Sequence, residues 1–94
     1  MKTQPVINLE TAEHVIGTLK SDFDSHDFLL VYILSDTISY LTLLKRYGSV
    51  ETTHQQVGQF LLSYASTLGI EKVGEVESEN IFGKTNTCAS WRRI

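Results

Sequence analysis

Apolar residues recur at three- and four-residue intervals through the first two-thirds of the chain, which is the spacing of amphipathic helices. A first helix is predicted near residue 9, with Asn8 or Thr11 as its cap. Its apolar stripe consists of Ala12, Val15, Ile16, Leu19 and Phe23. The segment SDFDSHD interrupts this pattern, and Asp24 or Ser25 is suited to cap the next helix.

The second helical region, from about His26 to Tyr47, is apolar on two neighbouring stripes. One stripe is Leu30, Leu34, Ile38 and Leu41, and the other is Ile33, Tyr40, Leu44 and Tyr47. A helix this broadly apolar needs two covering surfaces, or one covering surface and a partner chain. We take the second stripe as the candidate partner interface. The pattern leaves open whether the region is one bent helix or two helices divided at Ser35-Asp36.

A third helix is predicted from about Val50 to Leu68, closed by Gly69 in a left-handed turn. The pattern changes after it. The segment EKVGEVE is short and β-branched, and Gly74 is where a bulge is expected. The turn-forming letters SEN and the strand-like segment IFGKTNTCASWRRI follow. Either a bulge at Gly83 or a second turn at residues 85–87 is predicted there.

These elements predict one α+β domain over residues 1–94, with a helical part at about 9–69 and a β part at about 70–94. Three helices, or four if the second region divides, precede an antiparallel β-hairpin or three-stranded meander. Three helices followed by a hairpin is also the order of elements in a winged-helix domain. That order is an analogy, since a fold does not define a function.

Composition narrows the class of protein. The 94 residues are 41% hydrophobic and 20% charged, with a net charge of −3, which is typical of a small globular domain. Cys88 is the only cysteine, which excludes an internal disulfide and a metal site built on cysteines and favours a reducing compartment. The start MKTQPVINLE does not resemble a secretory signal, and the apolar run FLLVYIL is too short to span a bilayer. A cytoplasmic location is therefore expected.

No chemical motif is convincing. Gly83-Lys84-Thr85 matches only the last letters of a phosphate-binding loop, without the preceding glycine or a following helix. Ser25, His26 and Asp27 are consecutive, so they cannot form a catalytic relay among themselves. The three histidines have no metal-ligand spacing with one another or with Cys88. We predict no catalytic residue, metal or cofactor.

The third predicted helix carries an unusual polar flank. Residues 52–70 contain no formal charge, and the flank consists of Thr52, Gln55, Gln56, Gln59, Ser63 and Ser66. Uncharged amides and hydroxyls suit a polar interface or the edges of nucleic-acid bases. The acidic Glu75, Glu77 and Glu79 alternate along the following strand, where they discourage edge-to-edge aggregation or offer an acidic patch to a basic partner.

Two functions are therefore carried forward. The first is a non-enzymatic interaction protein, a homodimer that binds a partner protein. The second is a winged-helix-like regulator that binds nucleic acid. Its base-reading candidates are Gln55, Gln56 and Gln59, and its phosphate-binding candidates are Lys84, Arg92 and Arg93. The negative net charge weighs against the second function, because phosphate contacts supply most of the affinity for nucleic acid.

Overall fold

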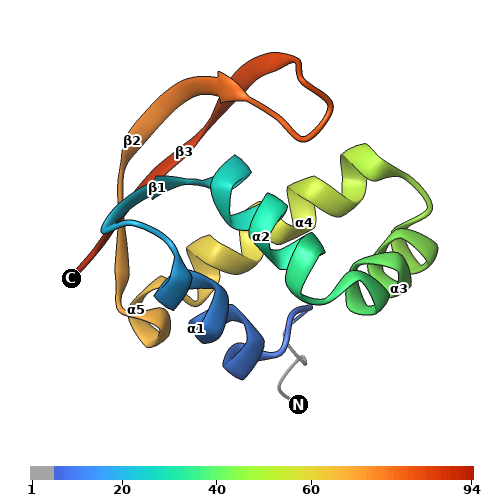
Figure 1. Ribbon diagram of the computed structural model, residues 1–94, viewed down its shortest axis with the longest axis horizontal. Coiled ribbons are helices and arrows are strands. Elements are labelled where there is room, and N and C mark those ends of the chain that lie inside the picture. Colours follow the sequence, from blue (N-terminus) through green and yellow to red (C-terminus); the bar gives the residue numbers. More distant parts are fainter. Residues whose placement is uncertain (1–5) are drawn as a thin grey trace.

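The computed structural model describes residues 6–94, in which five helices and three strands form an α+β fold (Figure 1). The elements are α1 (Leu9–Thr18), β1 (Asp22–Asp24), α2 (Ser25–Ser35), α3 (Thr37–Tyr47), α4 (Val50–Ser63), α5 (Ala65–Leu68), β2 (Ile70–Glu79) and β3 (Thr85–Arg93). The predicted fold class, helices followed by an antiparallel sheet in winged-helix-like order, is confirmed.

Helix α1 begins where the sequence predicts and ends earlier. The Asn8 side chain caps it by accepting from the backbone N–H groups of Glu10 and Thr11, at 2.9 and 3.3 Å. The helix ends at Thr18, so the prediction that Phe23 continues its apolar stripe is wrong. Phe23 is nevertheless buried, because it lies in β1 and points into the same core.

The second apolar region divides into two helices, which settles the alternative left open by the sequence. Asp36 ends α2 with its backbone N–H bonded to the Tyr32 carbonyl, and its Oδ1 accepts from Ser39 N–H to cap α3. The two helices are bent by 112° at this residue. No single helix within residues 6–94 has the length and apolarity to cross a membrane; α2 and α3 reach them only when taken together across this bend.

The predicted third helix is also divided. Tyr64 leaves helical geometry with φ −109° and ψ 15°, so α4 ends at Ser63 and the short α5 follows. Gly69 closes α5 with φ +70°, as predicted, a conformation that glycine adopts without steric cost.

The sheet has three antiparallel strands in the order β1-β3-β2. The third strand is β1, which the sequence did not predict. The second turn considered near residues 85–87 is not formed, because these residues belong to β3. A single turn at residues 80–84 joins β2 and β3, and Gly83 has φ +77° within it. The pairing register shifts between Lys72 and Gly74, so the bulge predicted near Gly74 is present.

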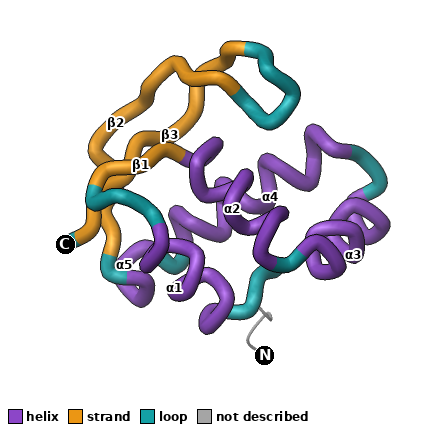
Figure 2. The backbone as a smooth tube through the Cα atoms, viewed as in Figure 1, coloured by secondary structure: helices purple, strands orange, loops and turns teal. Residues whose placement is uncertain are grey.

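One core joins the helices to the sheet. Trp91 on β3 is 1% exposed, pairs with Phe23 on β1, and donates its indole N–H to Ser25 Oγ at 3.0 Å. The β2–β3 hairpin then arches back over the helices, with its turn above α4 (Figures 1 and 2). At that turn the Phe82 ring stacks on His54 of α4, with centroids 6.2 Å apart. The hairpin is therefore anchored at both ends.

Candidate functional site

Three surfaces of the molecule carry exposed or half-buried side chains that are available to bind something else. The first is an exposed apolar ridge on the outside of the α2–α3 corner, which we call the α2–α3 ridge. Its exposed fractions are 49% for Leu30, 75% for Leu34, 78% for Ile38 and 55% for Leu41. These side chains lie one helical turn apart on each helix, so each helix presents one exposed apolar pair.

The predicted partner interface lies on the other stripe, which the fold uses internally. Tyr40 is 7% exposed, and its hydroxyl lies 2.7 Å from His54 Nε2. Ile33, Leu44 and Tyr47 are half-buried and pack against the core. The Arg46 guanidinium also lies 5.5 Å from the Tyr47 ring centroid. The apolar surface left over is therefore the α2–α3 ridge and not the stripe chosen from the sequence.

The second surface is the polar flank of α4. Gln55 and Gln59 are exposed and Gln56 is half-buried, so the amides lie outside the core. The predicted phosphate-binding residues do not converge on them. Only Lys84 lies in the hairpin turn, which reaches α4 through Phe82 and His54.

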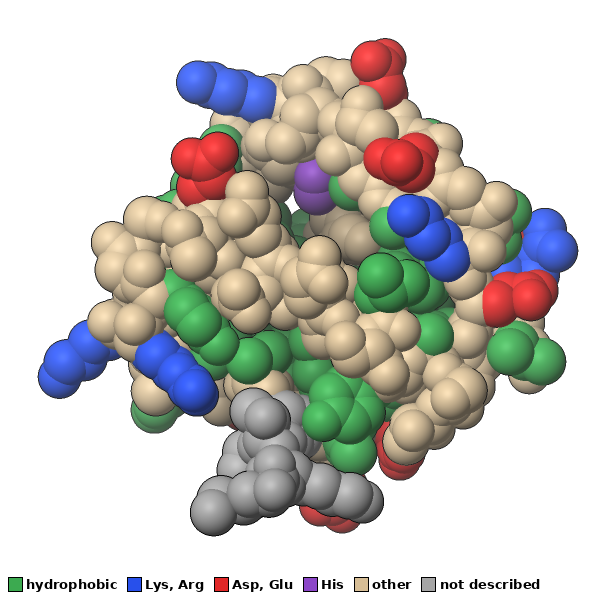
Figure 3. Space-filling model, turned by 180° about the vertical axis from the view of Figure 1, so that it is seen from behind, with side chains coloured by type: hydrophobic (Ala, Val, Ile, Leu, Met, Phe, Trp, Pro, Cys, Tyr) green, Lys and Arg blue, Asp and Glu red, His purple; other side chains and the backbone are tan. Residues whose placement is uncertain are grey.

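Arg92 and Arg93 lie near the opposite end of α4. The backbone N–H of Ile94, the next residue, donates to the Gly69 carbonyl beyond that helix. Arg92 pairs with Asp22 at 3.2 Å, and Arg93 donates to the Leu19 carbonyl. On the face drawn in Figure 3, acidic and basic side chains lie interspersed. The cations thus form no common patch with the glutamines.

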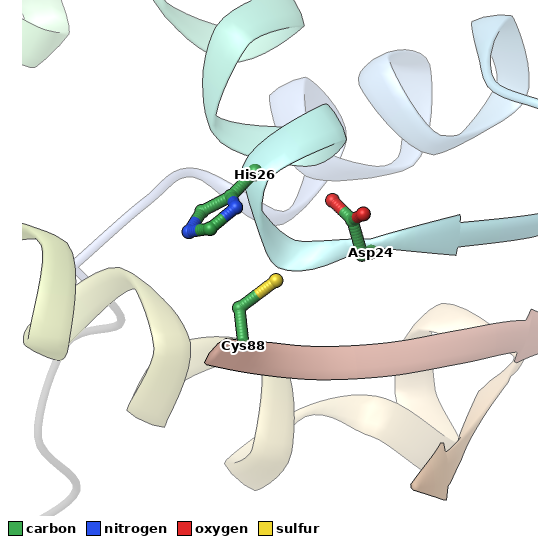
Figure 4. Close-up of side chains that lie close together, drawn as sticks. All are labelled: Asp24, His26 and Cys88. Carbon is green, nitrogen blue, oxygen red and sulfur yellow. The ribbon is translucent and has the colours of Figure 1, made fainter. Parts of the chain in front are cut away.

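The third surface holds the most chemically varied side chains. One donor atom each from Asp24, His26 and Cys88 lies within 4.8 Å of the other two, and all three residues are half-buried. Figure 4 shows the three side chains close together, at the end of β1, in the first turn of α2 and in the middle of β3. We call this group the Asp24–His26–Cys88 cluster.

Strand pairing explains why these residues meet. Asp24 pairs with Ser90, and Cys88 lies two positions along β3, so their side chains leave the sheet on one face. Val76 pairs with Cys88, which places Ser78 on that face as well. The Ser78 hydroxyl lies 2.6 Å from His26 Nδ1 and 3.6 Å from Cys88 Sγ, so it connects the ring and the thiol.

His54 lies close to this cluster. Burial, followed by the positive charge of nearby His26, lowers the pKa of His54 below its ordinary value. Burial also raises the pKa of Tyr40. A neutral imidazole therefore accepts a hydrogen bond from a neutral phenol. The face drawn in Figure 3 is hollowed, and a histidine side chain is visible inside the hollow.

Sequence reasoning missed the cluster because its residues are far apart in the chain. Asp24 and Cys88 are brought together only by the pairing of β1 with β3, and β1 is too short to show a strand pattern. The available signal was the mixture of types, since Asp, His and Cys are all metal ligands. Comparison of the chain with protein-family models, with curated proteins and with solved structures finds no match, so a function can be proposed only from the geometry.

Proposed function

We propose that this protein is a non-enzymatic interaction module that forms a homodimer through the α2–α3 ridge. The observation that supports this most directly is the exposure of Leu34 and Ile38, at 75% and 78%, on either side of the same corner. Contiguous exposed apolar side chains are typical of protein–protein contacts. The other large exposed apolar side chains, such as Leu62, Phe82 and Ile94, lie elsewhere on α4, in the hairpin turn and at the end of β3.

The charges around the ridge favour a second copy of the chain as the partner. Between Phe28 and Leu44 the only charged residue is Asp36, and its carboxylate is occupied in capping α3. A charged partner would need complementary charges at the rim of the contact. A two-fold contact between identical ridges needs none, because each apolar surface faces its own copy.

The ridge is small, so the dimer should be weak. Complete burial of one leucine or isoleucine side chain contributes about 1.5–3 kcal/mol. Association costs about 4–15 kcal/mol in lost freedom of motion. A symmetric contact counts the ridge twice, so the gain and the cost are of similar size, and we expect a dimer that forms only at high protein concentration. The polar flank of α4 and the glutamate-bearing strand β2 stay available for a different partner.

The test is light scattering during gel filtration over a range of protein concentrations. The wild-type chain should shift from monomer to dimer as its concentration rises. Ile38→Glu and Leu34→Glu should hold it as a monomer without unfolding it, because both side chains are exposed. Gln59→Glu, on the exposed flank of α4, is the matched control and should dimerise like the wild type. A monomer at millimolar concentration, or a dimer in both ridge variants, would refute the proposal.

A nucleic-acid-binding regulator is the second candidate, favoured by one observation: Gln55 and Gln59 are exposed on the last long helix before the hairpin. In a winged-helix protein that helix enters the major groove. The separation of Arg92 and Arg93 from these glutamines makes it the weaker candidate. An anisotropy titration with random duplex DNA at low salt decides, since electrostatic binding is strongest there. A chain that does not bind under those conditions is not a nucleic-acid-binding protein of this kind.

A further inference from the structure

The Asp24–His26–Cys88 cluster consists of polar side chains that the proposed contact through the α2–α3 ridge does not use. We propose that it is a binding site for a divalent transition-metal ion, with Zn²⁺ as the ion that its ligands suit best. The cluster offers one sulfur, one nitrogen and one oxygen donor within 4.8 Å of one another. Zinc takes these three ligand types in proteins, with bonds of roughly 2.0–2.3 Å.

The spacing fits an ion after a small adjustment. Two ligands of one zinc ion lie roughly 3.3–3.8 Å apart when the bonds have those lengths and the geometry is tetrahedral. The donors need to close from at most 4.8 Å, which side-chain rotation provides. The strand backbones are already fixed, since Asp24 is paired with Ser90 and Cys88 is paired with Val76 of β2.

Asp24 keeps its structural role when an ion binds. Asp24 caps α2 through Oδ1, which accepts from Asp27 N–H at 2.9 Å, so Oδ2 is the second oxygen that a cation can use. The capping box is completed by Asp27, whose carboxylate accepts from Asp24 N–H. Ser78 contacts both the imidazole and the thiol, which keeps these donors side by side before an ion arrives.

The mixture of donors decides the class of ion. Magnesium and calcium prefer oxygen ligands alone, whereas thiolate and imidazole select zinc and its late transition-metal neighbours. Binding converts the Cys88 thiol into a thiolate, and its proton passes to solvent. The thiolate and the carboxylate then balance the two positive charges of the ion. Three protein ligands leave a fourth position for water or for a donor from a partner.

Cobalt(II) is the first probe, because its bond to a thiolate gives a charge-transfer absorption band. The metal-free full chain should develop this band on titration with Co²⁺, and Zn²⁺ should remove it by displacement. Cys88→Ser should abolish the band. His26→Gln and Asp24→Asn should each weaken Co²⁺ affinity by roughly tenfold or more, since changes even beyond the direct ligands cost 10–100-fold. Asn remains a good helix cap, so Asp24→Asn removes the metal-binding carboxylate without removing the cap of α2.

His14→Gln is the matched control, because His14 is an exposed histidine on α1 outside the cluster. It should bind Co²⁺ like the wild type. Absence of the band in the wild-type chain would overturn the proposal, and so would equal losses in His14→Gln and His26→Gln. A second measurement avoids any folding defect of the variants: Zn²⁺ should slow alkylation of Cys88 in the wild-type chain at least tenfold. Unchanged alkylation would equally overturn the site.

Discussion

His54 is a half-buried histidine that lies against two aromatic rings. Its ring lies between Tyr40 and Phe82, with centroid distances of 5.8 and 6.2 Å, and its Nε2 lies 2.7 Å from the Tyr40 hydroxyl. Burial and the charge of His26 lower its pKa below the ordinary 6.5. In the unfolded chain the same imidazole regains its ordinary pKa. Folding therefore releases protons from this residue in mildly acidic solution.

We predict from this that the free energy of unfolding falls as the pH drops from 7.5 through 6.5 toward 5. The unfolded state binds more protons than the folded state in that window, and protons stabilise the state that binds more of them. Urea unfolding at pH 7.5 and 5.5 measures the loss. His54→Gln, which cannot titrate, should lose less stability over the same interval. An equal loss in both proteins would assign the pH dependence to other groups.

Asp36 determines the geometry of the α2–α3 corner, because it ends one helix and caps the next. Asp36→Ala should lower the free energy of unfolding by about 0.5–2 kcal/mol, the usual loss when an N-cap is removed. Asp36→Asn keeps a side-chain oxygen for the Ser39 N–H and should stay close to the wild type. Chemical denaturation of the three proteins provides the comparison. If Asn and Ala were equally destabilising, the charge and not the cap would be the important feature.

At the scale of helices and strands, the sequence correctly predicted those element ends that depend on residues nearby in the chain. The start of α1 follows from the predicted cap Asn8, and the predicted Gly69 ends α5 with positive φ. Strand β1 has no such signal. Its three residues are extended because they pair with β3, about seventy positions later in the chain. Short strands of this kind are determined by tertiary pairing and not by propensity.

The choice between the two apolar stripes of α2 and α3 shows the same limit. Both stripes have helical spacing and similar residues, so the sequence does not rank them. In the structure His54 of α4 contacts Tyr40, so the side of α3 that carries Tyr40 faces inward. The Asp24–His26–Cys88 cluster could not be predicted from the sequence either, since it depends on the pairing of β1, which was not predicted.

Two glycines provide a matched test of backbone conformation, one inside a helix and one in the left-handed turn that ends a helix. A Cβ atom added at Gly58 or at Gly69 meets no other atom within 4 Å, so only the backbone differs between these sites. Gly58 lies inside α4, and Gly58→Ala should raise the free energy of unfolding by about 0.5–1 kcal/mol. Gly69 has φ +70°, and Gly69→Ala should lower it by about 1–2 kcal/mol. Thermal unfolding of both variants checks the signs, and a stabilising Gly69→Ala would contradict the left-handed turn.

The whole molecule depends on the contact between the sheet and the helices at Trp91. This side chain is 1% exposed, pairs with Phe23, and hydrogen-bonds to Ser25 at the start of α2. Ile70 of β2 belongs to the same core as residues from α1, α2, α3 and α4. The helical and β parts that the sequence separates at about residue 70 therefore share one interior. A shared interior makes it costly to unfold either part alone.

We predict that the chain unfolds in a single cooperative step. Trp91 is the only tryptophan, so its fluorescence reports on the contact between sheet and helices, while far-UV circular dichroism reports mainly on the five helices. The two signals should give the same urea midpoint, because Trp91 cannot leave the core without exposing the helices that cover it. Phe82→Ala is a useful control, since it removes only the 59%-exposed ring at the hairpin turn and should leave the midpoints coincident. A fluorescence transition that precedes the loss of helix would show that the sheet unfolds alone, and that the chain is two units and not one domain.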